Sequence, residues 1–215
     1  EAIMTNANWQ PVKNSCKRDW GQSVQDVECE LNGAKCKIFA RHESGGEYGS
    51  NYKEVEWTVE RFEKATQILD MSGGIATDES ALKEDFELAK KRAEAFAMCW
   101  DAPTRTDLFF NKWERDNNPK DWFDPDDKQW KIGTPGTACR VNGVQGKVWA
   151  EKVNNGLKRI MWVVSVWEHS PQGLVWALRV RGAIYTSDSS LASDYELGKR
   201  RANEFALCWV EGKNK

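Results

Sequence analysis

The sequence predicts an α+β fold: a tandem duplication of a ββββα unit, in which a four-stranded antiparallel sheet has one helix packed across it. Two observations lead to this prediction: a pair of sequence blocks that recur in step, and the same order of turns, strands and helix in each copy. We expect two similar domains, a first repeat with an N-terminal extension at residues 1–100 and a second repeat at 128–215. Residues 101–127 are predicted to be an acidic, aromatic linker.

The duplication is seen in two blocks of the chain. The 14 residues from Glu87 to Trp100 return from Glu196 to Trp209 with nine identities at an offset of 109. Two distant blocks that stay in step within one residue indicate two copies of one unit of about a hundred residues. In the upstream block, at an offset of 110, Trp20, Cys29, Asn32, Gly33, Lys37 and Ala40 return as Trp130, Cys139, Asn142, Gly143, Lys147 and Ala150.

Each copy begins with a hairpin. In the first copy, residues 27–31 and 34–40 flank Asn32-Gly33, which supplies the positive φ angles of a type I′ turn. The second copy repeats this turn at Asn142-Gly143. Counting outward from the first turn predicts the cross-strand pairs Leu31–Ala34, Glu30–Lys35, Cys29–Cys36 and Glu28–Lys37.

A second hairpin follows in each copy. Residues 54–60 alternate apolar side chains with polar, mostly acidic ones, which is typical of a half-buried strand, and residues 66–75 are expected to pair with them. In the second copy, residues 160–167 are apolar on both faces. Residues 170–173 then turn the chain into a strand at 174–181.

Each copy ends with a helix. Apolar and small side chains repeat at spacings of 4, 3, 4, 3 and 4 in both copies, which predicts one buried helical face. Small residues in the middle of that face would let the helix lie close to the sheet. The two stripes are Leu82, Phe86, Ala89, Ala93, Phe96 and Trp100, and Leu191, Tyr195, Gly198, Ala202, Phe205 and Trp209.

Six cysteines form an even set, and two of them stand at equivalent places in each copy. Bonds within copies would join these equivalent pairs, because the second copy holds no other cysteine. Two alternatives stay open: a local bond between Cys29 and Cys36 across the first hairpin, and buried reduced thiols that pack as small apolar groups. The predicted disulfides are Cys139–Cys208, Cys29–Cys99 and Cys16–Cys36.

Repeat-matched cysteines favour a secreted or periplasmic protein, because disulfides persist in oxidising compartments. A cytoplasmic or viral intracellular location is the alternative if the thiols are reduced. We expect no metal site and no cofactor, since the chain has two histidines, no Cys-x-x-Cys spacing and no nucleotide-binding signature. Four carboxylates between Asp121 and Asp127 lack the order of an EF-hand loop and favour a solvated connector.

No catalytic residue is predicted. His42 and His169 do not occupy equivalent places in the two copies, and the signatures of serine hydrolases, zinc peptidases and phosphate-binding loops do not occur. We therefore expect a protein that is not an enzyme. The longest apolar run, residues 160–167, is too short to cross a bilayer, so we also expect no membrane span.

Candidate binding residues lie in the second copy, because its charge suits an anionic partner. The net charge is −5 over residues 1–100, −3 over 101–130 and +6 over 131–215. Each helix also has a basic triplet, for which a solvated face is favoured over a phosphate contact, with Glu87 pairing to Lys91 and Glu196 to Arg200. The candidates are Trp149, Trp167, Arg179, Arg181, Lys199, Arg200 and Arg201.

The expected order of elements resembles the ββββα repeats of PUR-type and Whirly-type single-strand nucleic-acid-binding proteins, which also use paired copies. The resemblance concerns element order alone and transfers no site residue. We expect a non-enzymatic binding or assembly protein that presents duplicated sheet surfaces to a macromolecular partner, either another protein or a second copy. A single-stranded nucleic-acid binder that uses the basic repeat is the alternative, and a carbohydrate-binding module with aromatic platforms comes third.

Overall fold

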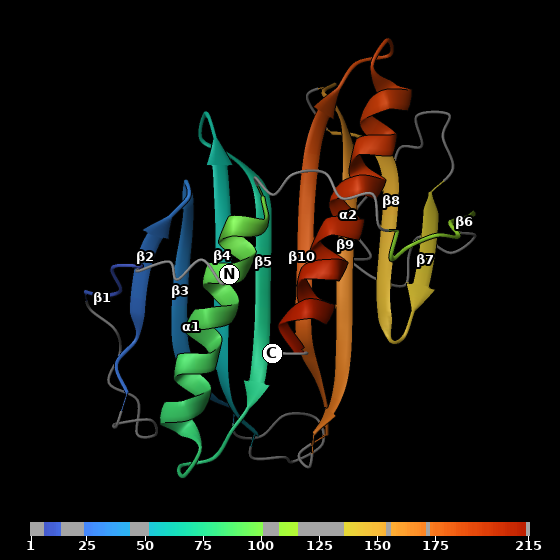
Figure 1. Ribbon diagram of the computed structural model, residues 1–215. Helices are drawn as coiled ribbons and strands as arrows, with labels where there is room; N and C mark the ends of the chain where they lie inside the picture. Colours follow the sequence, from blue (N-terminus) through green and yellow to red (C-terminus); the bar gives the residue numbers. More distant parts are fainter. Residues whose placement is uncertain are drawn as a thin grey trace. The chain divides into compact units, whose positions relative to one another are not determined.

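The computed structural model describes residues 7–13, 24–43, 52–100, 108–115, 136–153, 156–170 and 173–213 (Figure 1). The elements of the first half are β1 (Gln10–Pro11), β2 (Val27–Leu31), β3 (Ala34–Glu43), β4 (Tyr52–Glu63), β5 (Thr66–Ala76) and α1 (Leu82–Cys99). Those of the second half are β6 (Glu114–Arg115), β7 (Thr137–Val141), β8 (Val144–Lys152), β9 (Lys158–Ser170), β10 (Gly173–Thr186) and α2 (Leu191–Lys213).

The described strands belong to one ten-stranded antiparallel sheet, in the order β1-β2-β3-β4-β5-β10-β9-β8-β7-β6. The prediction of two separate four-stranded sheets, each with its own helix, is therefore wrong. The meander of each half leaves one side of β5 and of β10 unpaired. Long strands with an unpaired edge favour pairing with another strand, because exposed N–H and C=O groups are a template for it. The two-residue strands β1 and β6 are too short for any side-chain period to predict.

The chain divides into two compact units. Unit 1 comprises Glu1–Ala102 and Trp167–Arg179, and unit 2 comprises Pro103–Val166 and Val180–Lys215. The end of β9 and the start of β10 therefore belong to unit 1, together with β1 to β5 and α1. No helix in the described part of the chain is long and apolar enough to cross a membrane.

The predicted hairpin turns and their register are confirmed. Asn32 and Gly33 have φ angles of 52° and 72°, and Asn142 and Gly143 have φ angles of 48° and 79°. Asparagine and glycine tolerate this left-handed region better than other residues, which is why they occupy both positions of each turn. All four predicted cross-strand pairs of the first hairpin are present, including Cys29 opposite Cys36.

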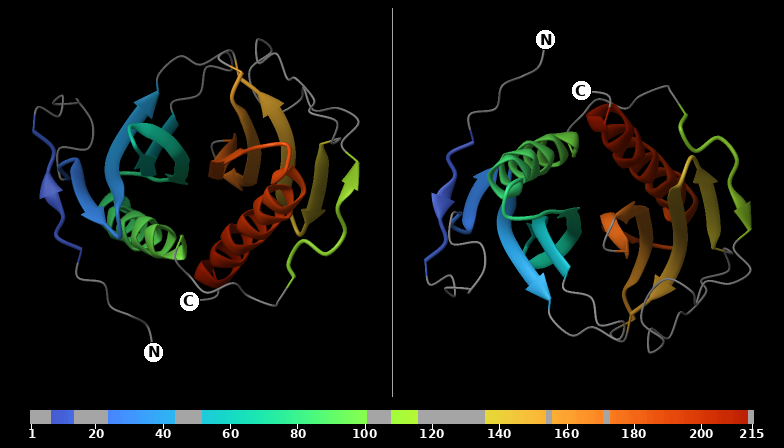
Figure 2. Two further views of the ribbon diagram at one scale, coloured as in Figure 1. Left: turned by 90° about the horizontal axis from the view of Figure 1, so that it is seen from above. Right: turned by 90° about the horizontal axis from the view of Figure 1, so that it is seen from below.

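The predicted helix stripes form the buried faces of both helices. In α1, five of the six stripe residues are buried, and Trp100 follows the last helical residue and is half-buried. The helix α1 packs mainly on β3 and β4, whereas α2 packs on β8 (Figure 1, Figure 2). The small residues Gly198 and Ala202 are fully enclosed in α2, as a close approach to the sheet requires.

A fully buried tryptophan stands in the centre of each unit's core. Trp57 stacks on Phe96 with ring centroids 5.3 Å apart, and Trp162 packs on Phe205 with centroids 5.1 Å apart. Each indole also lies flat against a glycine of the next strand. A Cβ atom on Gly73 would stand 2.2 Å from the Trp57 ring, and one on Gly182 would stand 2.0 Å from the Trp162 ring. Glycine is required at these positions by close approach.

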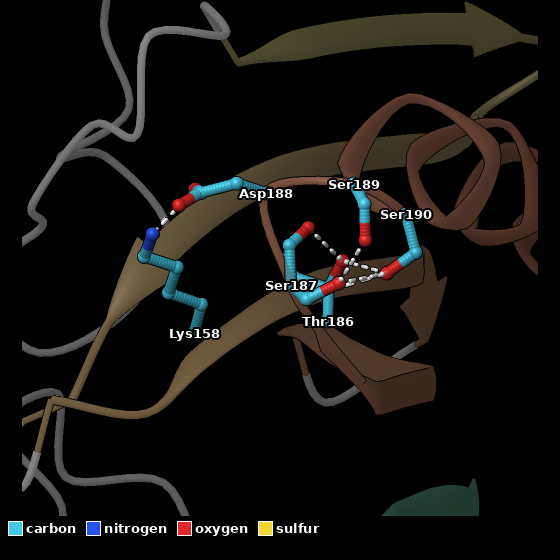
Figure 3. A network of polar contacts seen from close by, with 6 residues as sticks. All are labelled: Lys158, Thr186, Ser187, Asp188, Ser189 and Ser190. Carbon is cyan, nitrogen blue, oxygen red and sulfur yellow. Dashed lines mark hydrogen bonds and ion pairs between the residues drawn. The ribbon is translucent and has the colours of Figure 1, made fainter.

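The two helices begin differently. Before α1, the Asp78 carboxylate accepts hydrogen bonds from the backbone N–H groups of Ser80 and Ala81, at 2.8 and 3.0 Å. Before α2, hydroxyl groups take this part: the N–H of Ser187 donates to the Ser190 hydroxyl at 3.1 Å, and Lys158 pairs with Asp188 beside it (Figure 3). Both arrangements order the turn that leads into the helix, whereas Ala81, the residue at the start of α1, makes no side-chain cap hydrogen bond.

Candidate functional site

Three side chains of unit 1 form an aromatic and cationic cluster at the end of the β9–β10 hairpin. Trp167 and Trp176 contact each other with ring centroids 3.4 Å apart, and the Arg179 guanidinium lies 6.0 Å from the centre of the Trp176 ring. Trp167 keeps 37% of its surface exposed, while Trp176 and Arg179 are half-buried. We call these three residues the hairpin patch. Trp167 and Arg179 are predicted binding residues, and Trp176 is the member that the prediction missed.

The hairpin patch lies next to an acidic part of unit 1. The carbonyl oxygen of Trp176 lies 3.1 Å from the point where a Cβ on Gly74 would stand, and the Glu54 carboxylate lies 2.7 Å from the same point. Glu54 shares its strand face with Glu56, which forms an ion pair with Arg41 at 3.1 Å. The patch therefore combines indole surface and one guanidinium with neighbouring carboxylates.

Trp149 and Arg181 do not belong to this patch. Trp149 is in β8 of unit 2, where its indole N–H donates to the Glu151 carboxylate at 3.0 Å. Glu151 is itself buried and forms an ion pair with Arg159 on the paired strand. Arg181 is half-buried in the part of β10 that belongs to unit 2. The structure thus divides the four predicted sheet residues between the two units.

The basic triplet of α2 is largely engaged with its own helix. Lys199 pairs with Glu196 at 2.8 Å and lies over the Tyr195 ring at 5.4 Å. Arg201 pairs with Glu204 at 3.7 Å, while Arg200 is exposed. The expected pairing of Glu196 with Arg200 is replaced by an i,i+3 pair. In α1 likewise, Glu87 pairs with Lys90 at 2.7 Å, where a pair with Lys91 was expected.

The predicted disulfides are not formed between the described cysteines. Cys29, Cys36, Cys99, Cys139 and Cys208 are all free thiols, and Cys16 lies outside the described residues. The prediction placed each terminal helix over the first strand of its hairpin. Instead, α1 lies mainly over β3 and β4, and α2 over β8, so the helix cysteines are not brought to Cys29 or Cys139.

A buried polar cluster in unit 1 surrounds the Cys29–Cys36 pair. The Cys36 thiol donates a hydrogen bond to the Cys29 sulfur, which lowers the pKa of Cys29 and raises the pKa of Cys36. Arg61 donates to the Asn32 carbonyl and lies over the Trp100 ring at 5.1 Å. Both it and Glu94 are close enough to Cys36 to affect its titration.

Glu94 and Arg61 were missed at the level of sequence. The Glu94 carboxylate accepts a hydrogen bond from the Trp9 indole at 2.7 Å, a contact between residues 85 positions apart. Arg61 continues the alternation of Val55, Trp57 and Val59, so its place on the helix-facing side of β4 was readable from period two. The charge of Arg61 made this position unexpected, but a guanidinium can be stabilised there by an aromatic ring beneath it.

The segment preceding β6 packs within unit 2. Phe110 is 2% exposed and contacts Phe109 and Trp113 edge to face, with ring centroids 5.2 and 5.3 Å apart. The Asn203 side-chain oxygen accepts the backbone N–H groups of Phe109 and Phe110, at 2.7 and 2.9 Å. The carboxylates between Asp121 and Asp127, together with Trp122 and Phe123, lie outside the described residues.

The histidines and the acidic groups make no metal centre in the described ranges, where no three metal-binding side chains cluster. His42 is exposed on β3, and His169 is in β9.

Comparison with known proteins leaves the family open. No protein-family model matches the chain, and no curated protein matches it. A solved structure, the di-domain ARO/CYC StfQ from the steffimycin biosynthetic pathway, aligns over 95% of this chain and 89% of its own, at 11% identity. Its TM-score is 0.17, too low for the likeness to bear on fold or function.

Proposed function

We propose that the chain is a non-enzymatic binding protein that docks on a protein partner through the hairpin patch of Trp167, Trp176 and Arg179. The observation that supports this proposal is the contact between two indoles with a guanidinium at 6.0 Å, which leaves 37% of Trp167 accessible. Tryptophan and arginine are the side chains most enriched among residues that dominate protein–protein affinity.

The construction of the patch suits this role. Trp176 and the β10 backbone support Trp167 from one side, so the exposed indole is held in place and loses little conformational freedom on binding. The strand pairing of the hairpin gives the patch a rigid base. Aromatic surface surrounded by groups of both charges is typical of the centre and rim of a protein interface.

The electrostatics favour a protein over a nucleic acid. Lys199 and Arg201 already pair with carboxylates of their own helix, and the Glu54 carboxylate and the Trp176 carbonyl oxygen both lie close to Gly74. A surface that binds phosphates needs an excess of cations, because released counterions supply most of the affinity. The predicted basic surface is therefore weaker than the net charge of its sequence implies.

The test compares Trp167→Ala with a matched control. Phe62→Ala removes another exposed aromatic side chain, 52% accessible, from the β4–β5 hairpin of the same unit. Tagged wild type and both variants capture partners from cells of the source, and the recovered partner is purified and titrated against each. We expect Trp167→Ala to weaken binding about 30-fold, as loss of an interface anchor does. Phe62→Ala should bind like wild type.

Two further measurements identify the class of partner. Sedimentation velocity of the purified chain shows whether the partner is a second copy, in which case Trp167→Ala shifts the population toward monomer. Titration with a labelled single-stranded oligonucleotide at low salt should show no binding. Equal partner affinity in both alanine variants would contradict the proposal. Salt-sensitive oligonucleotide binding that Trp167→Ala and Arg179→Ala both weaken would replace it with nucleic-acid binding.

A further inference from the structure

The first hairpin holds two thiols in direct opposition. Cys29 in β2 pairs with Cys36 in β3, and both side chains are buried, with 6% and 0% of their surfaces exposed. Directly opposed residues of an antiparallel pair have Cα atoms about 4.5 to 5.5 Å apart. A disulfide needs about 4.4 to 6.8 Å between Cα atoms, so the ladder already provides the backbone spacing.

We propose that Cys29 and Cys36 are a redox-active thiol pair, which hydrogen peroxide converts to a reversible cross-strand disulfide. The proposal is independent of the hairpin patch, which is made by different strands.

Geometry and charge assign the two sulfurs different parts. Cys29 retains the exposed surface of the pair, so peroxide reaches it first. The hydrogen bond from Cys36 lowers the pKa of Cys29, and this effect outweighs those of burial and of the nearby Glu94 carboxylate, which raise it. Thiolate character directs oxidation to one sulfur and leaves the other to resolve it.

The reaction balances with one peroxide. The Cys29 sulfur attacks a peroxide oxygen, the O–O bond breaks, and the leaving oxygen departs as water with the Cys29 proton, so Cys29 becomes a sulfenic acid. The Cys36 sulfur then attacks the Cys29 sulfur, the S–O bond breaks, and a second water leaves with the Cys36 proton. Two thiols lose two electrons to one peroxide, which yields one disulfide and two waters. A thiol reductant reverses the bond by exchange.

Unit 2 supplies an internal control. Cys139 pairs with Gly146 at the corresponding place of the β7–β8 ladder, so this thiol has no cross-strand partner. Oxidation of the hairpin should therefore be confined to unit 1, even though Cys139 is buried to a similar degree, with 7% of its surface exposed.

The experiment counts thiols on the full chain. Reduced protein is treated with hydrogen peroxide, unfolded and alkylated, and its intact mass is measured. We expect six alkylated cysteines before treatment and four afterwards. Trypsin cleaves after Lys35, between the two cysteines, so the bond appears as a link between peptide 19–35 and a peptide that begins at Cys36. This map needs only wild-type protein, so it holds even if a variant fails to fold.

Two variants test whether the loss of thiols depends on Cys36 and is independent of Cys139. Cys36→Ala should form no disulfide and should leave Cys29 as a sulfenic acid that dimedone traps, whereas Cys139→Ala should still lose two thiols. The proposal is overturned if all six thiols survive peroxide, if the linked peptide joins Cys29 to Cys99 or Cys16, or if Cys36→Ala loses two thiols like wild type.

Discussion

The interiors of the two units differ in chemistry beside the β2–β3 and β7–β8 hairpins. In unit 1, Arg61 faces the helix from β4, opposite Ala34, the first residue of β3. In unit 2, Val166 stands opposite Val144, the first residue of β8, and is 4% exposed. A half-buried guanidinium that bonds the turn and lies over a tryptophan ring thus stands in unit 1, and a buried aliphatic side chain stands in unit 2.

A similar contrast occurs two pairs further from the turn of each hairpin. Cys36 stands opposite Cys29 in unit 1, whereas Gly146 stands opposite Cys139 in unit 2. The missing side chain of Gly146 leaves room for Phe110, whose ring would come within 2.6 Å of a Cβ at that position. Unit 1 therefore encloses a polar, titratable cluster, while unit 2 fills the equivalent volume with an aromatic ring. A sheet covered by a helix can therefore enclose either a polar cluster or an aromatic ring, provided that the space is filled and the polar groups are hydrogen-bonded.

The largest effect is expected when the arginine is moved to the unit that lacks its partners. Val166→Arg buries a guanidinium opposite Val144, and we expect the free energy of unfolding to fall by about 3 kcal/mol or more, as for other unpaired buried charges. Urea denaturation followed by tryptophan fluorescence measures the loss. Val166→Leu, which adds volume without charge, is the control. An equal loss in both variants would show that volume, and not charge, distinguishes the units here.

The next effect tests what the units share. Gly73→Ala and Gly182→Ala place a methyl group 2.2 and 2.0 Å from the rings of Trp57 and Trp162, both fully buried. We expect each to lower the free energy of unfolding by about 2 kcal/mol through overpacking. Gly212→Ala, which has open space around its Cβ position in α2, should be neutral or slightly stabilising. Thermal denaturation of the three variants decides this, and a neutral Gly182→Ala would contradict the close-packed account of unit 2.

A smaller effect is expected when unit 1 is made like unit 2. Arg61→Val removes the hydrogen bond to the Asn32 carbonyl and the contact with Trp100, but it also removes a buried charge. The two changes oppose each other, so we expect a loss of about 1 kcal/mol in the free energy of unfolding. Double-mutant cycles with Trp100→Leu measure the share of the ring contact. If the free energy of unfolding is higher for Arg61→Val than for wild type, the guanidinium lowers the stability of the fold.

The smallest effect concerns acid, and it should appear only at the start of α1. Hydrogen bonds from the Ser80 hydroxyl and from the backbone N–H groups of Ala81 and Ser80 hold the pKa of Asp78 below its ordinary value. A depressed pKa in the folded state stabilises the fold above the unfolded value, about 3.9, and this contribution is lost as the pH falls through the lower, folded value. Hydroxyl groups do not titrate there, so the contact between Ser187 and Ser190 before α2 is itself insensitive to acid.

Asp78→Ser transfers the cap chemistry of unit 2 to unit 1 and tests this difference. Melting temperatures of wild type and Asp78→Ser, measured from neutral pH into the acid range, should differ at neutral pH and converge as Asp78 of wild type becomes protonated. Ser190→Ala serves as the control, because its difference from wild type should stay constant with pH. A constant difference for Asp78→Ser would rule out the carboxylate as the cause.

Several features of this fold are decided by residues close together in the chain, and these followed from sequence. Asn32-Gly33 and Asn142-Gly143 specify a tight turn by their own backbone preferences, and a turn of known length sets the register of the strands beside it. The stripe from Leu82 to Phe96 lies on one face because helical geometry alone places it there. Of the candidate site, Trp167 and Arg179 were predicted because they belong to the basic second copy.

The remaining features depend on contacts between distant residues, which only the tertiary structure decided. Any two strand edges offer the same backbone groups, so no side-chain pattern indicated that β5 and β10 would be neighbours in one sheet. Equivalent cysteines in two copies predict equivalent surroundings but not contact, and the thiols stayed free because the helices lie over other strands. Glu94 came to Trp9 through long-range packing, which has no signature in neighbouring residues, whereas Trp176 lies across the predicted turn at 170–173 from Trp167.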